Sequence, residues 1–179
     1  MGVLATARMK EDAVALDIGG TTTDISVFAD GVPLLEPSGV AINGRKTLIR
    51  GLYTKSIGVG GDSVVKVENG DLLIGPQREG SAAALGGPVP TPTDAMIVEG
   101  IVDFGDRQKA RDAIAPLAKM LHMDVQDAAQ AIVKRMAALI SDHVRPVSYT
   151  HLRAHETVLD LVCRLLLEKK KKQRATPHS

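Results

Sequence analysis

The feature that most constrains this chain is a pair of short β-prone apolar runs separated by two consecutive glycines. Residues 13–17 form the first run, Gly19-Gly20 interrupts it, and residues 25–28 resume it. Apolar runs of this length, bounded by glycine, predict two strands joined by a tight turn. A further apolar run at 32–35 predicts a third strand. The chain therefore begins with a small sheet.

The middle of the chain repeats the hairpin pattern and then becomes rich in loops. Asn69-Gly70 lies between apolar runs at 64–67 and 72–74, which is a strong hairpin signal. Residues 47–53 fit either a strand or a short helix. Residues 75–92 form a Gly, Pro and Ala-rich loop whose length suggests a functional role.

The apolar period becomes helical after residue 92. The spacing predicts three helices, at 93–102, 106–123 and 125–144. Thr93 or Asp94 is placed to cap the first of them, and Pro116 predicts a kink or break in the second. Because strands come first and helices follow, the fold class is α/β or α+β.

Composition limits the classes of function. The 179 residues include 44% hydrophobic and 24% charged residues, which is typical of a soluble globular protein. Two Phe, two Tyr and no Trp leave few aromatic surfaces for stacking bases, which argues against nucleic-acid binding. The N-terminus lacks a signal-peptide pattern, and no apolar run reaches the ~18 residues that a bilayer requires. We therefore expect a cytoplasmic protein that binds neither nucleic acid nor membrane.

The segment Asp17-Ile18-Gly19-Gly20-Thr21-Thr22-Thr23-Asp24 has the chemistry of a phosphate clamp. Paired glycines allow backbone N–H groups to approach a phosphate closely, and the threonine hydroxyls add hydrogen bonds. Asp17 is suited to hold the divalent cation that accompanies a nucleotide. The alternative is a tight hairpin with solvated threonines, and the spacing alone favours the two interpretations equally.

The same segment, DIGGTTTD, is similar to the phosphate loop of the actin-like, sugar-kinase-like ATPase superfamily. Three further motifs follow in order: SIGVGGDS at 56–63, LLIGP at 72–76 and PTPTDA at 90–95. Together they resemble the hydantoinase/oxoprolinase (hydantoinase A) family over residues 3–145. The resemblance implies an actin-like, ribonuclease-H-like ATPase lobe, of which residues 1–145 are an incomplete middle-domain fragment.

The resemblance also implies a site for ATP and Mg²⁺. The residues expected to contact the phosphates and the cation are Asp17, Gly19, Gly20, Thr21, Thr22 and Asp24, with Asp17 as the metal ligand. Gly58, Gly60 and Gly61 are expected to form a second backbone-lined wall. Thr93 and Asp94 are expected to face the same cleft, unless they serve only as a helix cap. The resemblance assigns no catalytic residue.

Two departures from the family pattern concern the substrate. Lys55-Ser56 stands where many relatives have His-Thr, and small residues at 81–85 replace the usual Pro-Ala-Cys-Tyr. His122 and His143 are interpreted as ordinary surface or boundary residues. The implied activity is ATP-dependent hydrolysis of a small cyclic amide, such as a hydantoin or 5-oxoproline. The alternatives are a subunit of a ketone carboxylase, working with a partner subunit, and a non-hydrolytic actin-like module. In this superfamily the nucleotide lies between two lobes, so we expect the fragment alone to be inactive.

The last part of the chain has a different origin in this interpretation. Residues 146–157, PVSYTHLRAHET, back-translate to a transposase adapter of short-read sequencing libraries, and residues 160–169 to the flow-cell primer that follows it. Lys169–Lys172 then fit a poly-A run. Residues 146–179 hold seven Lys/Arg and three Asp/Glu, whereas residues 1–145 hold 15 and 18. We therefore expect residues 146–179 to be a non-native tail and the natural C-terminus to be missing.

Overall fold

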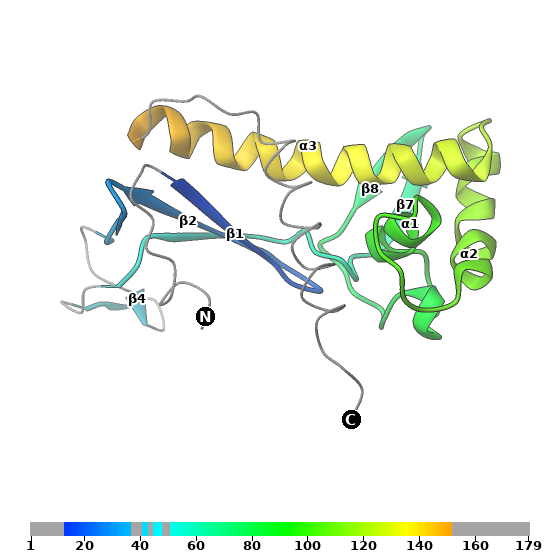
Figure 1. Ribbon diagram of the computed structural model, residues 1–179, viewed down its shortest axis with the longest axis horizontal. Helices are drawn as coiled ribbons and strands as arrows, with labels where there is room; N and C mark the ends of the chain where they lie inside the picture. Colours follow the sequence, from blue (N-terminus) through cyan, green and yellow to red (C-terminus); the bar gives the residue numbers. More distant parts are fainter. Residues whose placement is uncertain (1–12, 37–40, 43–44, 48–50, 152–179) are drawn as a thin grey trace.

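The computed structural model describes residues 13–36, 41–42, 45–47 and 51–151. In this part of the chain the strands come first and the helices follow, as the sequence predicts (Figure 1). The strand pairings are antiparallel, and the fold is mixed α/β.

The main sheet is built around one central strand. Strand β2 (Thr23–Ala29) pairs along one edge with β1 (Ala13–Ile18). Its other edge is shared by β6 (Thr54–Ile57), near the β1–β2 loop, and by β3 (Val32–Pro33), at the far end. The hairpin prediction is confirmed, but β3 is shorter than the apolar run at 32–35.

The ambiguous segment at 47–53 lies partly outside the described residues. Within it, Leu52 forms an isolated antiparallel bridge with Leu35. A short hairpin of β4 (Ala41–Ile42) and β5 (Arg45–Lys46) precedes this segment. Strand β6 begins just after it and was not predicted from sequence.

The second predicted hairpin is confirmed. Strands β7 (Val65–Glu68) and β8 (Asp71–Ile74) pair on either side of Asn69-Gly70. Both turn residues have positive φ, 53° and 84°, which is the geometry that favours Asn-Gly in two-residue hairpin loops. The loop that follows contains one turn of 3₁₀ helix, η1 (Ala83–Leu85).

The three helices differ from the expected ones at their ends. Helix α1 (Pro92–Val98) begins one residue early, because Thr91 is its N-cap and Pro92 occupies its first turn. The N-cap is therefore Thr91 and not Thr93 or Asp94, although Asp94 completes the capping box by accepting a hydrogen bond from Thr91 N at 2.9 Å. Helix α2 (Arg107–Met120) continues through Pro116 without a break. Helix α3 (Val125–His151) extends beyond residue 144 and contains Pro146.

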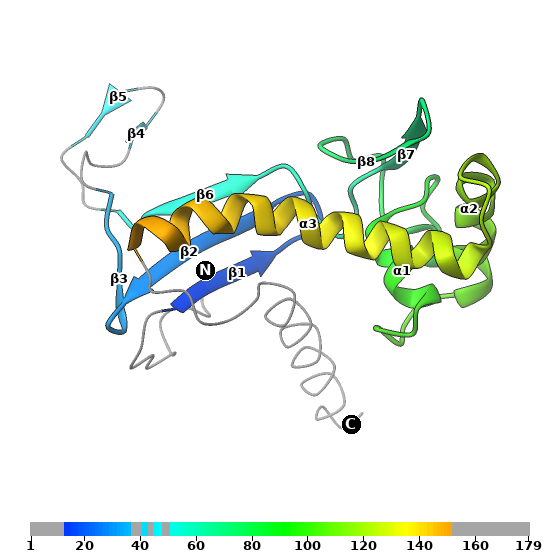
Figure 2. The same cartoon turned by 90° about the horizontal axis from the view of Figure 1, so that it is seen from above.

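Helix α3 packs against both the main sheet and helices α1 and α2. It crosses the β1–β2–β6 sheet and continues to α1 and α2, as Figures 1 and 2 show. One face of the helix contributes its core residues: Ala128, Ala129, Ile132, Met136, Ile140 and Val144. They share one hydrophobic core with Ile25 and Ile57 of the sheet. Burial of such a stripe is the main stabilising contribution that an amphipathic helix makes.

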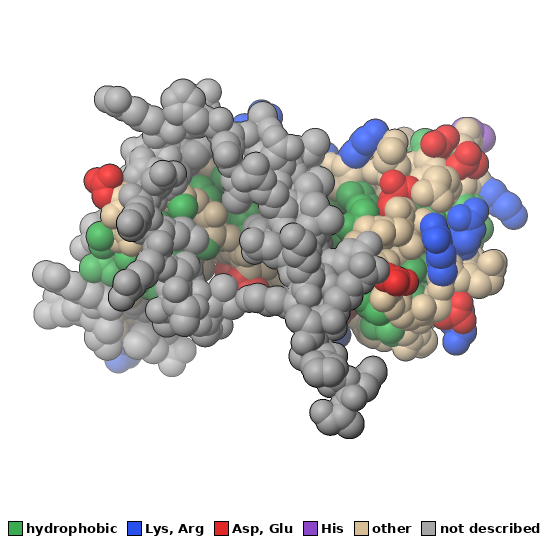
Figure 3. Space-filling model, viewed as in Figure 1, with side chains coloured by type: hydrophobic (Ala, Val, Ile, Leu, Met, Phe, Trp, Pro, Cys, Tyr) green, Lys and Arg blue, Asp and Glu red, His purple; other side chains and the backbone are tan. Residues whose placement is uncertain are grey.

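The surface of the helical end mixes both signs of charge. On the face drawn in Figure 3, acidic and basic side chains alternate over the end formed by α2 and the start of α3. Within the described residues, no helix is both long and apolar enough to cross a membrane.

Candidate functional site

The loop between β1 and β2, residues 19–22, carries backbone donors that the protein does not use. A hydrogen bond of 2.9 Å from Gly19 N to Thr22 O closes the loop, and the Thr21 and Thr22 residues are exposed. Among the described residues, none accepts a hydrogen bond from the N–H of Gly20, Thr21 or Thr22. Successive free N–H groups in a turn form a concave site that attracts anions.

A second glycine-rich segment fixes this loop from the side. Gly61 N donates to Gly19 O at 2.8 Å, and Asp62 N donates to Gly20 O at 2.6 Å. A Cβ atom on Gly60 would lie 2.6 Å from the Gly19 and Gly20 carbonyl oxygens. Only glycine therefore allows the two segments to approach this closely.

The N–H groups of that segment face inward. Gly60 N donates to Ser63 Oγ at 2.9 Å, and Gly61 N is already bonded to the loop. Both glycines therefore support the loop through internal bonds. Gly58 packs elsewhere, because a Cβ atom there would lie 2.8 Å from Pro76 Cβ. The structure brings Gly60 and Gly61 of the expected wall to the loop and places Gly58 against Pro76.

Thr23 anchors the beginning of β2. Its hydroxyl donates to Val59 O at 2.7 Å, and the side chain is fully buried. Of the three threonines in the motif, Thr23 is therefore a structural residue. Thr21 and Thr22 remain as the hydroxyl groups that are open to solvent.

Two aspartates and a serine form a row across the sheet beside the loop. Asp17 of β1 is the register partner of Asp24 in β2, and Asp24 is the partner of Ser56 in β6. Partners in adjacent antiparallel strands lie on the same face of the sheet. The neighbouring positions, such as Ile25, face α3 in the core, so this row lies on the opposite face.

The Asp17–Asp24 pair is electrostatically unfavourable on its own. Like charges that lie directly opposite in a sheet destabilise it, and a cation between them would remove the repulsion. Within the described chain, no cluster of three or more His, Cys, Asp or Glu could hold a metal. Mg²⁺ commonly takes one or two carboxylates and completes its shell with phosphate oxygens and water. The donor set fits that mode of binding.

Asp94, which was expected to face the same cleft as the loop, is fully buried. Its Oδ2 accepts hydrogen bonds from Ala83 N at 3.0 Å and from the Thr91 N and Oγ1 at 2.9 Å each. Its Oδ1 accepts from Ala84 N at 2.8 Å. The carboxylate thus joins η1 to the start of α1. A direct contact with nucleotide remains a prediction, and it would require some of these bonds to break.

Lys55 and Ser56, which depart from the family pattern, lie on opposite faces of the main sheet. Lys55 pairs with Ile25, on the face that packs against α3, whereas Ser56 pairs with Asp24. Ser56 is therefore the member of the pair that lies in the polar row. His122 is exposed after the end of α2, and His143 Nδ1 lies 2.8 Å from Leu139 O within α3.

Two charged residues beside the loop were missed from sequence. Asp62 carries one of the bonds that fix Gly20, and Arg78 forms an ion pair with it at 3.0 Å. Asp62 could have been noticed because it follows Gly60-Gly61 directly. No local pattern distinguishes Arg78, which reaches the site from the segment after β8.

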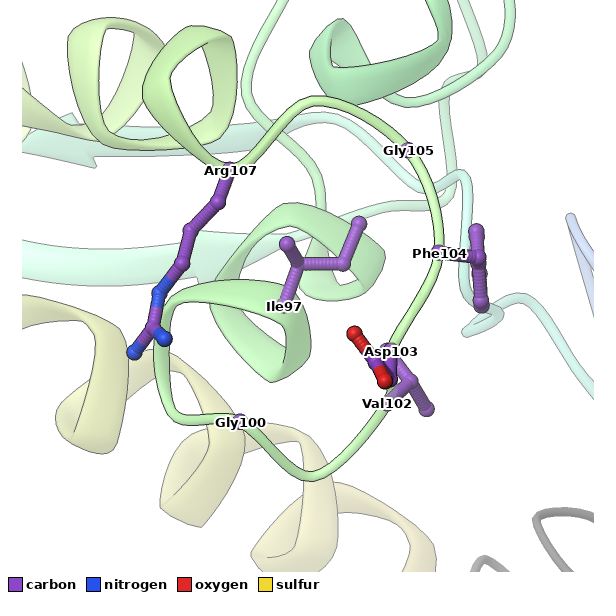
Figure 4. Close-up of a pocket in the computed structure, with 7 residues that line it drawn as sticks. All are labelled: Ile97, Gly100, Val102, Asp103, Phe104, Gly105 and Arg107. Carbon is purple, nitrogen blue, oxygen red and sulfur yellow. The ribbon is translucent and has the colours of Figure 1, made fainter.

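Two pockets lined by described residues lie away from this loop. One cavity of about 250 Å³ lies between the end of α1 and the start of α2 and is lined by Ile97, Asp103 and Arg107, among others (Figure 4). Arg107 there donates to Val98 O at 2.6 Å. A groove of about 420 Å³ runs between β7 and α2. Neither contains a residue of the predicted phosphate site.

Comparison with known proteins gives one family match. A family model described as hydantoinase/oxoprolinase matches residues 1–164. The match extends past Arg145, where the sequence predicts that the natural segment ends, and the origin of residues 146–179 stays a prediction. The acetophenone carboxylase gamma subunit of Aromatoleum aromaticum (strain DSM 19018 / LMG 30748 / EbN1) is 30% identical over 119 residues, which are 60% of this chain and 16% of that protein.

Two solved structures share the fold. Nucleotide-free acetone carboxylase, an enzyme of ATP-dependent acetone carboxylation, matches with a TM-score of 0.66 and 21% identity, over 77% of this chain and 22% of its own. The ATP-dependent caprolactamase from Pseudomonas jessenii matches with a TM-score of 0.63 and 24% identity, over 80% and 23%. The chain thus spans less than a quarter of each of these proteins. The likeness confirms the predicted α/β class and agrees with part of an actin-like ATPase fold.

Proposed function

Because the chain belongs to the hydantoinase/oxoprolinase family, we propose that it forms part of an enzyme that uses ATP to open a small cyclic amide. Residues 17–24 are its phosphate-binding loop. The observation that carries this proposal is the set of three free N–H groups at Gly20, Thr21 and Thr22, held in place by the bonds to Gly61 and Asp62.

The loop is suited to phosphate because hydrogen bonds from a second segment of the protein fix its backbone. Two bonds from the 60–62 segment fix the Gly19 and Gly20 carbonyl groups, so the adjacent N–H groups need little further ordering when an anion binds. Thr21 and Thr22 add two exposed hydroxyl groups. Asp17 and Asp24 would hold Mg²⁺, which would supply positive charge that offsets the charge of the phosphates.

When bound, ATP would supply the phosphoryl group that activates the amide carbonyl oxygen, with ADP as the leaving group, and phosphate would leave after water attacks the carbonyl carbon. The residues of this chain would bind and orient the phosphates and neutralise their charge through N–H groups and the cation. The support for a cyclic amide is the family and the fold shared with a caprolactamase, whose name identifies a lactam as its substrate.

A second candidate is a subunit of an ATP-dependent carboxylase. The acetophenone carboxylase gamma subunit and acetone carboxylase both resemble this chain, and the former is by name one subunit of a larger enzyme. Under this alternative the same loop binds ATP, but the reaction forms a carbon–carbon bond in a complex with partner subunits. A non-hydrolytic actin-like module would keep the loop and lack both reactions.

The first test is calorimetric titration of the 179-residue chain with MgATP. The Asp17→Ala, Thr21→Ala double variant should lose binding, while Asp142→Ala, which removes an exposed aspartate from α3, should retain it. Equal binding by all three proteins would reject residues 17–24 as the phosphate loop.

The second test separates the reactions and uses the product of the complete gene. Release of phosphate from ATP that depends on hydantoin, 5-oxoproline or caprolactam supports the hydrolase. Release that depends on a ketone and bicarbonate supports the carboxylase. ATP binding without phosphate release that depends on either set of substrates supports the non-hydrolytic actin-like module.

A further inference from the structure

Asp62 contacts Gly20 of the phosphate loop through both its backbone and its side chain. Its N–H donates to Gly20 O at 2.6 Å. Its carboxylate lies against the α-carbon, because a Cβ atom on Gly20 would be 2.7 Å from Asp62 Oδ2. A carboxylate at this position would repel an incoming phosphate unless a cation neutralised it.

Arg78 provides a cation at that point. Its Nη2 donates to the same Oδ2 atom of Asp62 at 3.0 Å, so one carboxylate oxygen connects the guanidinium to Gly20. The Arg78 side chain is 48% exposed and the Asp62 side chain 22%. Ion pairs as exposed as this contribute little to stability, so a structural role gives only a weak reason for the arrangement.

The guanidinium has capacity left for a ligand. It carries five N–H donors in a planar fork that matches phosphate oxygens, and the recorded bond to Asp62 uses one nitrogen. Asp17, Asp24 and Asp62 give the site three acidic residues. A polyphosphate therefore needs positive charge from the protein in addition to Mg²⁺.

We propose that Arg78 is a phosphate ligand of the loop at Gly20–Thr22, and that Asp62 is the residue that positions it. The inference rests on the proposed function, because it assumes that the loop binds phosphate. Asp62 restricts the long arginine side chain before the ligand arrives, which lowers the entropy that binding would otherwise cost.

The experiment uses the ¹⁵N-labelled 179-residue chain titrated with sodium tripolyphosphate at millimolar concentrations in excess MgCl₂ and followed by NMR. The amide signals of Gly20, Thr21 and Thr22 and the Nε–Hε signal of Arg78 should shift together, with one Kd. Arg78→Ala should raise that Kd about tenfold, as expected for one charge-assisted contact. Arg78→Lys should recover part of the loss, because lysine keeps the charge but not the fork.

Two further variants separate ligand binding from general effects. Arg135→Ala removes an exposed arginine from α3 and controls for net charge, so its Kd should equal that of the parent. Asp62→Ala should lower the heteronuclear NOE of Arg78 Nε, because the side chain is no longer held.

The outcomes distinguish the two proposals. If the parent chain shows no shift of the loop amides, the phosphate loop itself is rejected, and the role of Arg78 is rejected with it. If the parent binds but Arg78→Ala binds as tightly as Arg135→Ala, only the role of Arg78 is overturned. If Arg78 Nε is equally ordered in Asp62→Ala, Asp62 does not position it.

Discussion

The carbonyl oxygen of Gly61 accepts two hydrogen bonds from Thr93, one from its backbone N–H at 2.9 Å and one from its hydroxyl at 2.8 Å. Gly61 N in turn donates to Gly19 O. The start of α1 is therefore connected through Gly61 to the proposed phosphate loop. A Cβ atom on Gly61 would lie 2.8 Å from Thr93 Oγ1, so this contact also requires glycine.

Thr93→Val tests that connection. Valine keeps the shape and the backbone bond but loses the hydroxyl bond to Gly61 O. We expect the free energy of unfolding to fall by about 1 kcal/mol. Urea denaturation measures this change. Thr93→Ser keeps the hydroxyl and is the control, and equal losses for the two variants would mean that the bond contributes nothing.

Gly60→Ala should separate the phosphate loop from its support. The added methyl group would meet the Gly19 and Gly20 carbonyl oxygens at 2.6 Å, so the backbone would have to shift. Such overpacking costs about 1–3 kcal/mol of stability. We expect both lower stability and weaker MgATP binding. Gly70→Ala is the control, because its methyl group meets no atom within 4 Å and only the positive φ of 84° is strained. It should lower stability and leave MgATP affinity unchanged.

Asp17→Asn should have opposite effects on stability and on Mg²⁺ binding. Removing one charge of the Asp17–Asp24 pair should raise the free energy of unfolding without Mg²⁺ by about 0.2–1 kcal/mol. It should also weaken the dependence of ATP binding on Mg²⁺. Asp71→Asn is a matched control, because Asp71 faces Glu68 across the β7–β8 hairpin. A similar loss of Mg²⁺ dependence in this control would count against a cation site at Asp17.

Asp94→Asn should lower the free energy of unfolding. An amide NH₂ group cannot accept from the N–H groups that now bond to the carboxylate, so at least one buried donor loses its partner. The expected loss in the free energy of unfolding is about 1–3 kcal/mol, measured by thermal or urea unfolding. Asp142→Asn on the exposed face of α3 should change stability little. A stable Asp94→Asn protein with impaired MgATP binding would instead favour a nucleotide contact.

The tail interpretation is tested at the level of DNA. Amplification of the gene from source DNA, without adapter ligation, and sequencing across codons 140–160 should give a sequence that departs from the present one at codon 146. A genomic sequence that encodes PVSYTHLRAHET in the same frame would reject the adapter origin of residues 146–179.

Local patterns predicted most elements because each depends on neighbouring residues. The Asn69-Gly70 turn needs positive φ at both positions, and the helical stripe of α3 needs only its own spacing. The helix cap was predicted wrongly by two to three residues, since Thr91 and Asp94 satisfy each other across the first turn and leave Thr93 to bond with Gly61. Strand β6 was missed because Thr54–Ile57 has little β pattern and is a strand through its pairing with β2.

The β1–β2 hairpin, the order of strands and helices, and the residue types of the proposed phosphate loop could be predicted from sequence, because they follow from local periodicity, turn chemistry and glycine. Which of those residues remain open to a ligand depends on the tertiary structure. Thr23, Gly61 and Asp94 use their polar groups on partners in other segments of the chain, whereas Gly20, Thr21 and Thr22 keep free N–H groups. The reason is that a hydrogen-bond donor is available only if no other segment satisfies it, and packing brings those segments together from positions that local sequence does not encode.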